Sequence, residues 1–399
     1  MVVRLTSASA RAVIASVVAV MLALSPAYLT GALGLQIRAE LGLSAAELGV
    51  AIGAFFAATA LLSPLLGSAA DRIGTVRSLR LALALLVGSC LTVLGFVRSL
   101  STLVVALVMG GIANGLVGPA TSRLVAHHVR GRRSLAFGLR QAAVPLSTLL
   151  AGVAVPVVGL ALGWRAAYSG VALITLPLIL VARSSVVADD GGLNRRGGAV
   201  SDVRGLILVA LAFLLATSAG TALMAFLVDL SVERGLTEAA GGAVLAGVSA
   251  SGIVVRVAVG WFADRPGVDA FVVMQRQVMV GIAGFLLLVL PTGGIGLMVG
   301  ATMAIAGGWG WTGLMAHAVA QGNPDAPARS AGIVQTGGAA GGVVGPPLAG
   351  LLIDRTAHAG AWGASLLLLI LAFVAVSAAR RTELADRFRL AQSDSEVGR

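Results

Sequence analysis

From Val278 to Gly310 the chain reads VMVGIAGFLLLVLPTGGIGLMVGATMAIAGGWG, within a stretch from Gln277 to Asn323 that contains no aspartate, glutamate or arginine. A helix crosses the hydrocarbon core of a bilayer with about 20 apolar residues, so this stretch is too long for one crossing. The Pro-Thr-Gly-Gly sequence at 291–294 is a helix-breaking turn signal. The stretch therefore predicts two membrane-spanning helices joined by a tight turn.

The rest of the chain has the same character, since 58% of its 399 residues are hydrophobic and only 11% are charged. Soluble domains carry about 25% charged residues. Uncharged runs of spanning length predict an all-α integral membrane protein with twelve transmembrane helices, at 11–34, 46–69, 79–97, 101–126, 134–161, 165–182, 205–229, 239–262, 269–290, 294–319, 330–353 and 361–379. The first run resembles a signal peptide, but it is long enough to cross, so we expect a retained helix.

The longest internal connection is polar and rich in glycine, a composition that cannot bury a core. It predicts a six-helix bundle over 1–183, a cytoplasmic linker over 184–204, a second six-helix bundle over 205–380 and a cytoplasmic tail over 381–399. With the N-terminus inside, 22 of the 28 arginines fall in or beside cytoplasmic segments and five fall outside. The positive-inside rule therefore predicts a multi-pass protein of the cell membrane with both termini in the cytoplasm.

The sequence lacks the motifs that are typical of several other classes of protein. The chain has no lysine and hence no Walker A loop, its one cysteine cannot form an internal disulfide, and no metalloprotease or Gly-x-Ser-x-Gly motif occurs. The net charge of +11 comes from arginines spread over short connections, unlike the basic stripe of a nucleic-acid-binding protein. We expect no enzyme activity, no cofactor, no metal and no nucleic-acid partner.

One phrase occurs at the same place in both halves. GSAADRIGTVR runs from Gly67 to Arg77 after the second span, and GWFADRPG runs from Gly260 to Gly267 after the eighth. These phrases resemble the signature loop of the major facilitator superfamily, Gly-x-x-x-Asp-Arg-x-Gly-x-x-Arg/Lys, and its weaker second copy. The resemblance implies a carrier of two six-helix bundles that works by alternating access. It also implies a gating motif formed by Gly67, Asp71, Arg72, Gly74, Arg77, Gly260, Asp264 and Arg265.

The gating motif has a physical interpretation. Asp71, at the cytoplasmic end of helix two, is expected to face the positive N-terminus of helix eleven near Ser330, with Arg77 completing the ion pair. One position departs from the resemblance, because Leu107 in helix four stands where many proton-coupled members carry arginine. Coupling to a proton or another ion therefore stays open.

Polar and aromatic residues within the spans are the candidates for a substrate site. Two arginines stand out, because Arg256 lies in span eight and Arg140 lies at similar depth in span five, while no carboxylate falls in the middle of any span. A charge within the membrane requires a partner, which an anionic substrate could supply. The other candidates are Asn114, Gln335, Trp309, Trp311 and Tyr28.

Each candidate also has a purely structural interpretation. Both arginines could extend to the membrane surface or bind backbone carbonyls, and Asn114 could form a hydrogen bond between helices. The leading hypothesis is a monomeric carrier of a small organic or inorganic anion in the lipid bilayer, and the alternative is efflux of amphipathic drugs. A membrane enzyme or a receptor on the same scaffold has no sequence feature of its own.

Overall fold

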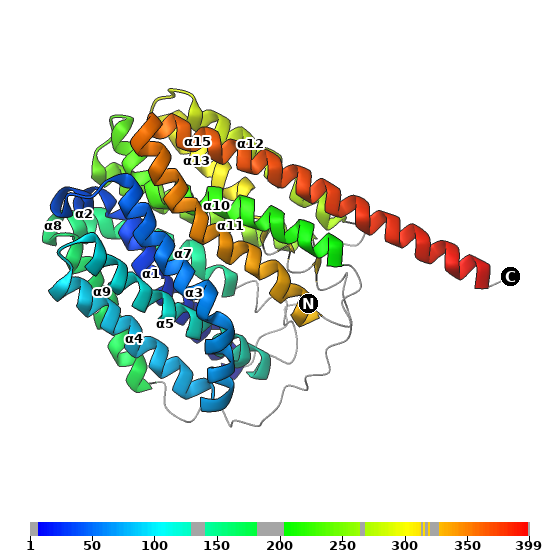
Figure 1. Ribbon diagram of the computed structural model, residues 1–399, viewed down its shortest axis with the longest axis horizontal. Coiled ribbons are helices and arrows are strands. Elements are labelled where there is room, and N and C mark those ends of the chain that lie inside the picture. Colours follow the sequence, from blue (N-terminus) through cyan, green and yellow to red (C-terminus); the bar gives the residue numbers. More distant parts are fainter. Residues whose placement is uncertain are drawn as a thin grey trace.

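The computed structural model describes residues 7–128, 140–181, 203–263, 268–312, 314–315, 318–319 and 327–397. These residues form helices and short turns, with no strand among them (Figure 1). The expected linker over 184–204 lies almost entirely outside the described residues, so the domain boundaries stay predictions. Because a lipid environment offers the backbone no hydrogen-bond partner, long helices are the expected solution for so apolar a chain.

The first half of the chain contains α1 to α9 and the second half contains α10 to α15. The bounds in the first half are α1 Ser7–Ala32, α2 Gly34–Leu41, α3 Ala45–Ile73, α4 Thr75–Phe96, α5 Leu100–His128, α7 Ala143–Ala154, the π-helix η1 Val155–Gly159, α8 Leu160–Leu162 and α9 Trp164–Val181. Those in the second half are α10 Val203–Glu233, α11 Glu238–Ala263, α12 Ala270–Val289, α13 Gly294–Gly308 and α15 Pro327–Val397.

The helices fit the twelve expected spans. Nine described helices are long and apolar enough to cross a membrane, and two shorter apolar helices, Trp164–Ile179 and Gly294–Gly308, occupy the expected sixth and tenth positions. The longest candidate, Ser330–Thr382, comprises two helices, because the backbone of Ala357 is non-helical, with φ 58° and ψ −174°. This bend separates the expected eleventh and twelfth helices.

Local sequence explains where the helices begin and bend. Ser44 and Glu47 form a reciprocal capping box at the start of α3. Gly74 ends the same helix with φ 85°, a conformation that only glycine adopts without strain. Pro156 lies at the start of the π-helix η1 in the expected fifth span, where its missing N–H disrupts the regular ladder.

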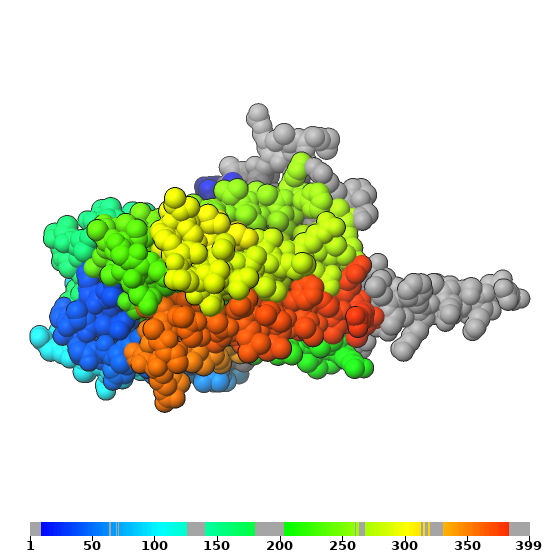
Figure 2. Space-filling model, turned by 90° about the horizontal axis from the view of Figure 1, so that it is seen from above, coloured from blue at the N-terminus to red at the C-terminus, as the bar shows by residue number. Residues whose placement is uncertain are grey.

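The two halves pack through close helix crossings. A Cβ atom added to Gly31 of α1 would lie 2.7 Å from the Cα of Ala225 in α10. Between α7 and α11, the hydroxyls of Thr148 and Ser249 form a 2.7 Å hydrogen bond. Helices of the second half also pack on one another, and Figure 2 shows α12 and α13 (yellow-green to yellow) beside the orange and red parts of α15 on one face.

The two ends of the molecule differ. At one end, which we call the α2 end, α3 and α15 are in backbone contact: Gly49 adjoins Pro346, and the Asp354 carboxylate accepts hydrogen bonds from the amides of Ala45 (3.0 Å) and Ala46 (2.8 Å). At the opposite end, which we call the far end, α3 finishes at Ile73 and α15 begins. The two helices diverge toward the far end in Figure 1.

An apolar cleft of about 270 Å³ marks the beginning of this divergence. Its lining comes from successive turns of both helices, Ala57, Ala60, Leu61, Thr336, Ala339, Ala340, Val343 and Val344. The halves are therefore closed at the α2 end and separate toward the far end along this pair of helices.

Candidate functional site

Arg256 extends from α11 into the junction of the two halves. Its Nη1 donates to the carbonyl of Gln141 (2.9 Å) in the first half, and its Nη2 donates to the carbonyl of Trp309 (3.3 Å) in the second. The guanidinium carbon also lies 5.4 Å from the centre of the Trp309 ring, within range of a cation–π interaction. One charged side chain thus connects α11, the expected helix five and the expected helix ten.

The expected helix ten is interrupted where Arg256 meets it. Helix α13 ends at Gly308, and Trp309 has φ −124° and ψ −5°, outside the helical range. The expected span over 294–319 is therefore not one continuous helix, because the run Gly307-Gly308-Trp309-Gly310 contains three glycines, which are poor helix formers. The interruption releases carbonyls from the helical ladder, and the Trp309 carbonyl becomes an acceptor for Arg256.

Arg140 lies beside the same junction. Its Nε donates to the hydroxyl of Thr121 (3.1 Å) and its Nη2 donates to the carbonyl of Gly118 (3.2 Å), both on α5. Since the carbonyl of the next residue, Gln141, accepts from Arg256, the two arginines come from adjacent parts of the interface. The expectation of similar depth fits this arrangement.

Neither arginine has an acidic partner among the described residues. The ion pairs of that part of the chain involve Arg38, Arg165, Arg380 and His358. A guanidinium carries five N–H donors, and the hydrogen bonds of Arg140 and Arg256 to the described residues use two each, all to neutral oxygens. The junction thus carries two positive charges with unused donors.

The other candidates divide into two groups. Tyr28 is buried and packs edge-on against Phe56 at 6.4 Å. Trp311 is fully buried, donates from Nε1 to the Gly308 carbonyl (2.7 Å) and packs against Phe213. The structure therefore places Tyr28 against α3 of its own half and packs the Trp311 ring into the core.

Asn114 and Gln335 lie apart from these contacts. The Asn114 amide donates to the Thr59 hydroxyl (3.3 Å) and so joins α5 to α3, as the structural interpretation of this residue anticipated. Gln335 is exposed near the beginning of α15. Neither side chain forms a hydrogen bond with the two arginines in the described part of the chain.

The carbonyl groups were missed from the sequence, because any residue supplies one and its availability depends on broken helix geometry. Gln277 of α12 was also missed: it is 8% exposed, and its Oε1 is buried without a hydrogen-bond partner. A Cβ on Gly310 would lie 3.3 Å from its Nε2, so this amide lies beside the helix interruption. The Gly-Trp-Gly run at 308–310 was the sequence feature from which the helix interruption could have been predicted.

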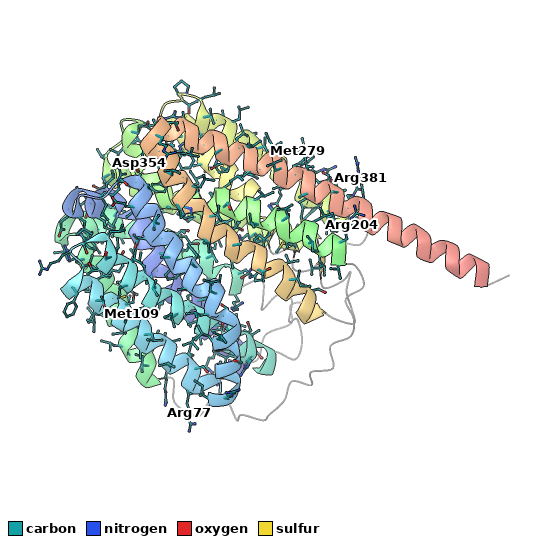
Figure 3. All side chains as sticks on the ribbon, in the orientation of Figure 1. Arg77, Met109, Arg204, Met279, Asp354 and Arg381 are labelled. Carbon is teal, nitrogen blue, oxygen red and sulfur yellow. The ribbon has the colours of Figure 1, made fainter. Side chains whose placement is uncertain are left out.

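The gating motif lies at the far end. Gly67 and Gly74 belong to α3 and its C-terminal cap, Arg72 and Arg77 are exposed, and Figure 3 shows Arg77 projecting from this end, away from Asp354. Arg123 of α5 donates to the carbonyl of Ala70 (3.1 Å) next to the motif. The Asp71 side chain and all of Asp264 and Arg265 lie outside the described parts, and Gly260 falls near the end of α11. The proposed latch between Asp71 and helix eleven therefore stays a prediction.

Comparison with known proteins decides the family. The family model described as Major Facilitator Superfamily matches residues 15–321. The chain belongs to the major facilitator superfamily. Membership confirms the resemblance and the fold class, and it makes this protein a multi-span membrane transporter rather than an enzyme. No curated protein sequence matches the chain.

Solved structures share the superfamily fold. A bacterial homologue of the human lysosomal transporter Spinster, in an inward-facing and unoccupied conformation, aligns with a TM-score of 0.75 and 16% identity over 96% of this chain and 98% of that one. The inward-facing and occupied form of such a homologue aligns with a TM-score of 0.71 and 16% identity over 94% and 98%. At this identity the likeness shows the fold alone.

Proposed function

We propose that this transporter carries a small organic or inorganic anion by alternating access, with Arg256 and Arg140 as the anion-binding residues. The observation that supports the proposal most directly is the pair of guanidinium groups at the junction of the halves, held by neutral oxygens and without a carboxylate among the described residues. Positive charge held inside a membrane protein is costly without a counterion. A carboxylate or phosphate group would neutralise it and use the free donors.

The surroundings suit a small anion with an apolar portion. The Trp309 ring lies against Arg256 and also fills the space above Gly220, where a Cβ would lie 3.0 Å from the indole. It offers a flat apolar wall beside the charge. The hydroxyl of the buried Tyr28 is a further candidate donor to the anion.

The conformation of the two ends supports alternating access. The halves are in contact at the α2 end, whereas α3 and α15 diverge toward the far end. With both termini in the cytoplasm of a cell-membrane protein, as the arginine distribution predicts, the far end is cytoplasmic and this conformation is open to the inside. Reporter fusions at each terminus test this orientation, and an external terminus would reverse the assignment of the two ends.

Binding measurements on purified protein test the anion site. The probes are phosphate, acetate, citrate and a lipophilic cation. Their binding is measured by thermal stabilisation of the protein and by calorimetry. We expect Arg256→Ala to weaken anion binding by roughly 10-fold to 100-fold, since a hydrogen bond to a charged group contributes about 1.5 to 3 kcal/mol. Arg256→Lys should restore part of the affinity, because lysine keeps the charge but not the bidentate geometry.

Arg234→Lys is the matched control. Arg234 also binds backbone carbonyls, those of Leu288, Leu290 and Thr292, but it lies on the turn after α10 at the α2 end, whereas Arg256 lies near the other end of α11. This variant should leave anion affinity unchanged. If anions bind wild type and Arg256→Ala equally, the proposal is wrong, and stabilisation by the lipophilic cation alone would favour the efflux of amphipathic drugs.

A further inference from the structure

His358 lies between two carboxylates at the α2 end. It follows the bend at Ala357, its side chain is 9% exposed, and its ring stacks on Trp362 with 6.0 Å between centres. Nδ1 is 2.7 Å from Oε2 of Glu233, and Nε2 is 3.5 Å from Oδ2 of Asp229. Both carboxylates belong to the last turns of α10.

The two ring nitrogens differ in what they require. A 2.7 Å contact between Nδ1 and the Glu233 carboxylate calls for an N–H at Nδ1, because two acceptors would repel each other. In the neutral ring Nε2 is then a bare acceptor. Within the described part of the chain this atom is buried without a hydrogen-bond partner, and it faces the Asp229 carboxylate. A proton on Nε2 would turn this unfavourable pairing into a donor that faces a carboxylate.

The same Asp229 oxygen also serves the other half of the molecule. Nη1 of Arg38, from α2, donates to Oδ2 of Asp229 at 2.8 Å, so this ion pair connects the first half to the second. A proton on His358 and the guanidinium of Arg38 thus approach one oxygen from two sides. His358 and Asp229 belong to the second half and Arg38 to the first, so a separation of the halves would part Arg38 from Asp229 but not His358 from Asp229.

We propose that His358 is a proton-binding site linked to opening of the α2 end, where a proton on Nε2 weakens the ion pair between Arg38 and Asp229. With a neutral ring, Arg38 pairs with Asp229, and the second carboxylate, that of Glu233, lies on the other side of the ring. With a protonated ring, half of that negative charge is already neutralised, so the closed arrangement attracts Arg38 less. Linkage makes the effect reciprocal: closure with Arg38 in place favours release of the proton.

The remaining charges near this cluster are occupied elsewhere. Glu40 of α2 binds Arg165 and Trp164, Glu238 of α11 accepts from Gln36 at 2.6 Å, and Asp354 of α15 caps α3. Arg234 of α10 binds three carbonyls, and Arg355 is exposed. The proposal depends on the cluster of Arg38, Asp229, Glu233 and His358 and is independent of the anion site.

The experiment measures the separation of the halves at the α2 end as pH changes. Spin labels are attached to Ala39→Cys on α2 and Ile295→Cys on α13, both at exposed positions, in a Cys90→Ser background. Electron–electron distance measurements on purified full-length protein then report the open and closed populations. We expect the ratio of open to closed protein to rise by about fivefold or more from about pH 8 to about pH 5, the range over which histidine changes charge.

His358→Gln should abolish this pH dependence and keep the open fraction at its alkaline value, because glutamine stays neutral. A wild-type distribution that does not change with pH, or a His358→Gln variant that retains the change, would overturn the proposal. If His358→Gln does not fold, Glu233→Gln serves instead. It removes one carboxylate from the ring, so the transition should move to lower pH, and an unmoved transition would equally overturn the proposal.

Glu238→Gln is the matched control. Glu238 also connects the halves, through Gln36, whereas the carboxylates at the His358 ring are those of Asp229 and Glu233. This variant should change the open fraction at every pH alike and leave the transition in place. If the pH of the opening transition moved as far in Glu238→Gln as in Glu233→Gln, the shift would reflect the overall charge at the α2 end, and a specific proton-binding site at His358 would be contradicted.

Discussion

The α2 end and the far end are built from different chemistry. At the α2 end, side chains from one half bind side chains or amides of the other, as in Arg38 with Asp229 and Asp354 with the start of α3. Near the far end, Arg140 binds only neutral groups of α5 in its own half, and Arg256 binds only neutral groups. Among the described residues, the α2 end is therefore held by one inter-half ion pair and by hydrogen bonds to the start of α3, whereas the junction arginines bind neutral oxygens alone.

This difference teaches how one carrier can hold one end closed while the other separates. Glycine contacts permit backbone approach along α3 and α15, and charged groups then fix that approach at the α2 end only. If the ion pair and the close approach of the helices both stabilise the closed end, each can be removed by a separate mutation. The spin labels on Ala39→Cys and Ile295→Cys then report the effect of each mutation on the separation of the halves.

The largest effect is expected from Gly49→Val. A Cβ at this position would collide with the Pro346 carbonyl, and the backbone around it has little room to move. Overpacking costs about 1 to 3 kcal/mol, so the closed population should fall by roughly 5-fold to 150-fold. The distance measurement should show a larger separation at the α2 end.

Gly247→Val is the control for this change, because a Cβ on Gly247 of α11 meets no atom within 4 Å. It adds the same side chain to a helix without blocking an approach. Equal distance distributions in Gly49→Val and wild type would show that the close contact is not required for closure.

An intermediate effect is expected from Arg38→Ala. The ion pair with Asp229 is partly buried, with side-chain exposures of 24% and 16%, so its loss should cost more than a surface pair. We expect about 1 to 3 kcal/mol and a closed population roughly 5-fold to 150-fold smaller. A double-mutant cycle with Asp229→Asn measures the coupling between the two residues, and a coupling near zero would remove the pair from the closing mechanism.

The smallest effect is expected at Glu40, whose partners lie in its own half. Hydrogen bonds from Arg165 and then Trp164 hold the pKa of Glu40 below its usual value. Because the folded-state pKa is lowered, the stabilisation is present above the pKa of the unfolded carboxyl and is lost as pH falls through the folded-state value. The carboxylate is about half exposed, so the contribution should be below about 1 kcal/mol.

Thermal unfolding of wild type and Glu40→Gln across the acid range measures this contribution. The two proteins should differ slightly at neutral pH and converge in acid, while the distance between the labels stays the same in both. A change of that distance in Glu40→Gln would mean that pairs within one half also control opening, and the contrast between the two kinds of ion pair would disappear.

Much of the fold followed from sequence, while the site followed only in part. Hydropathy identified the helices because each span must satisfy its own backbone and present apolar side chains to lipid. The same criterion did not reveal the helix interruption at Trp309, because glycine and tryptophan are both common in membrane helices and leave the mean hydropathy of the span high. Arg256 and Arg140 were recognisable as rare charges in apolar runs, whereas their carbonyl partners were not.

From the sequence alone, this chain could be recognised as a helical membrane protein, its spans could be located approximately, and its repeated Gly-x-x-x-Asp-Arg loop could be matched to a superfamily. These properties depend on composition and short spacing, which a linear pattern carries. Only the tertiary structure decided that Arg256 meets an interrupted helix at Trp309, and that Arg38 and His358 converge on Asp229. Such contacts join residues far apart in the chain, and helical periodicity specifies which face a residue occupies without specifying which helix lies opposite that face.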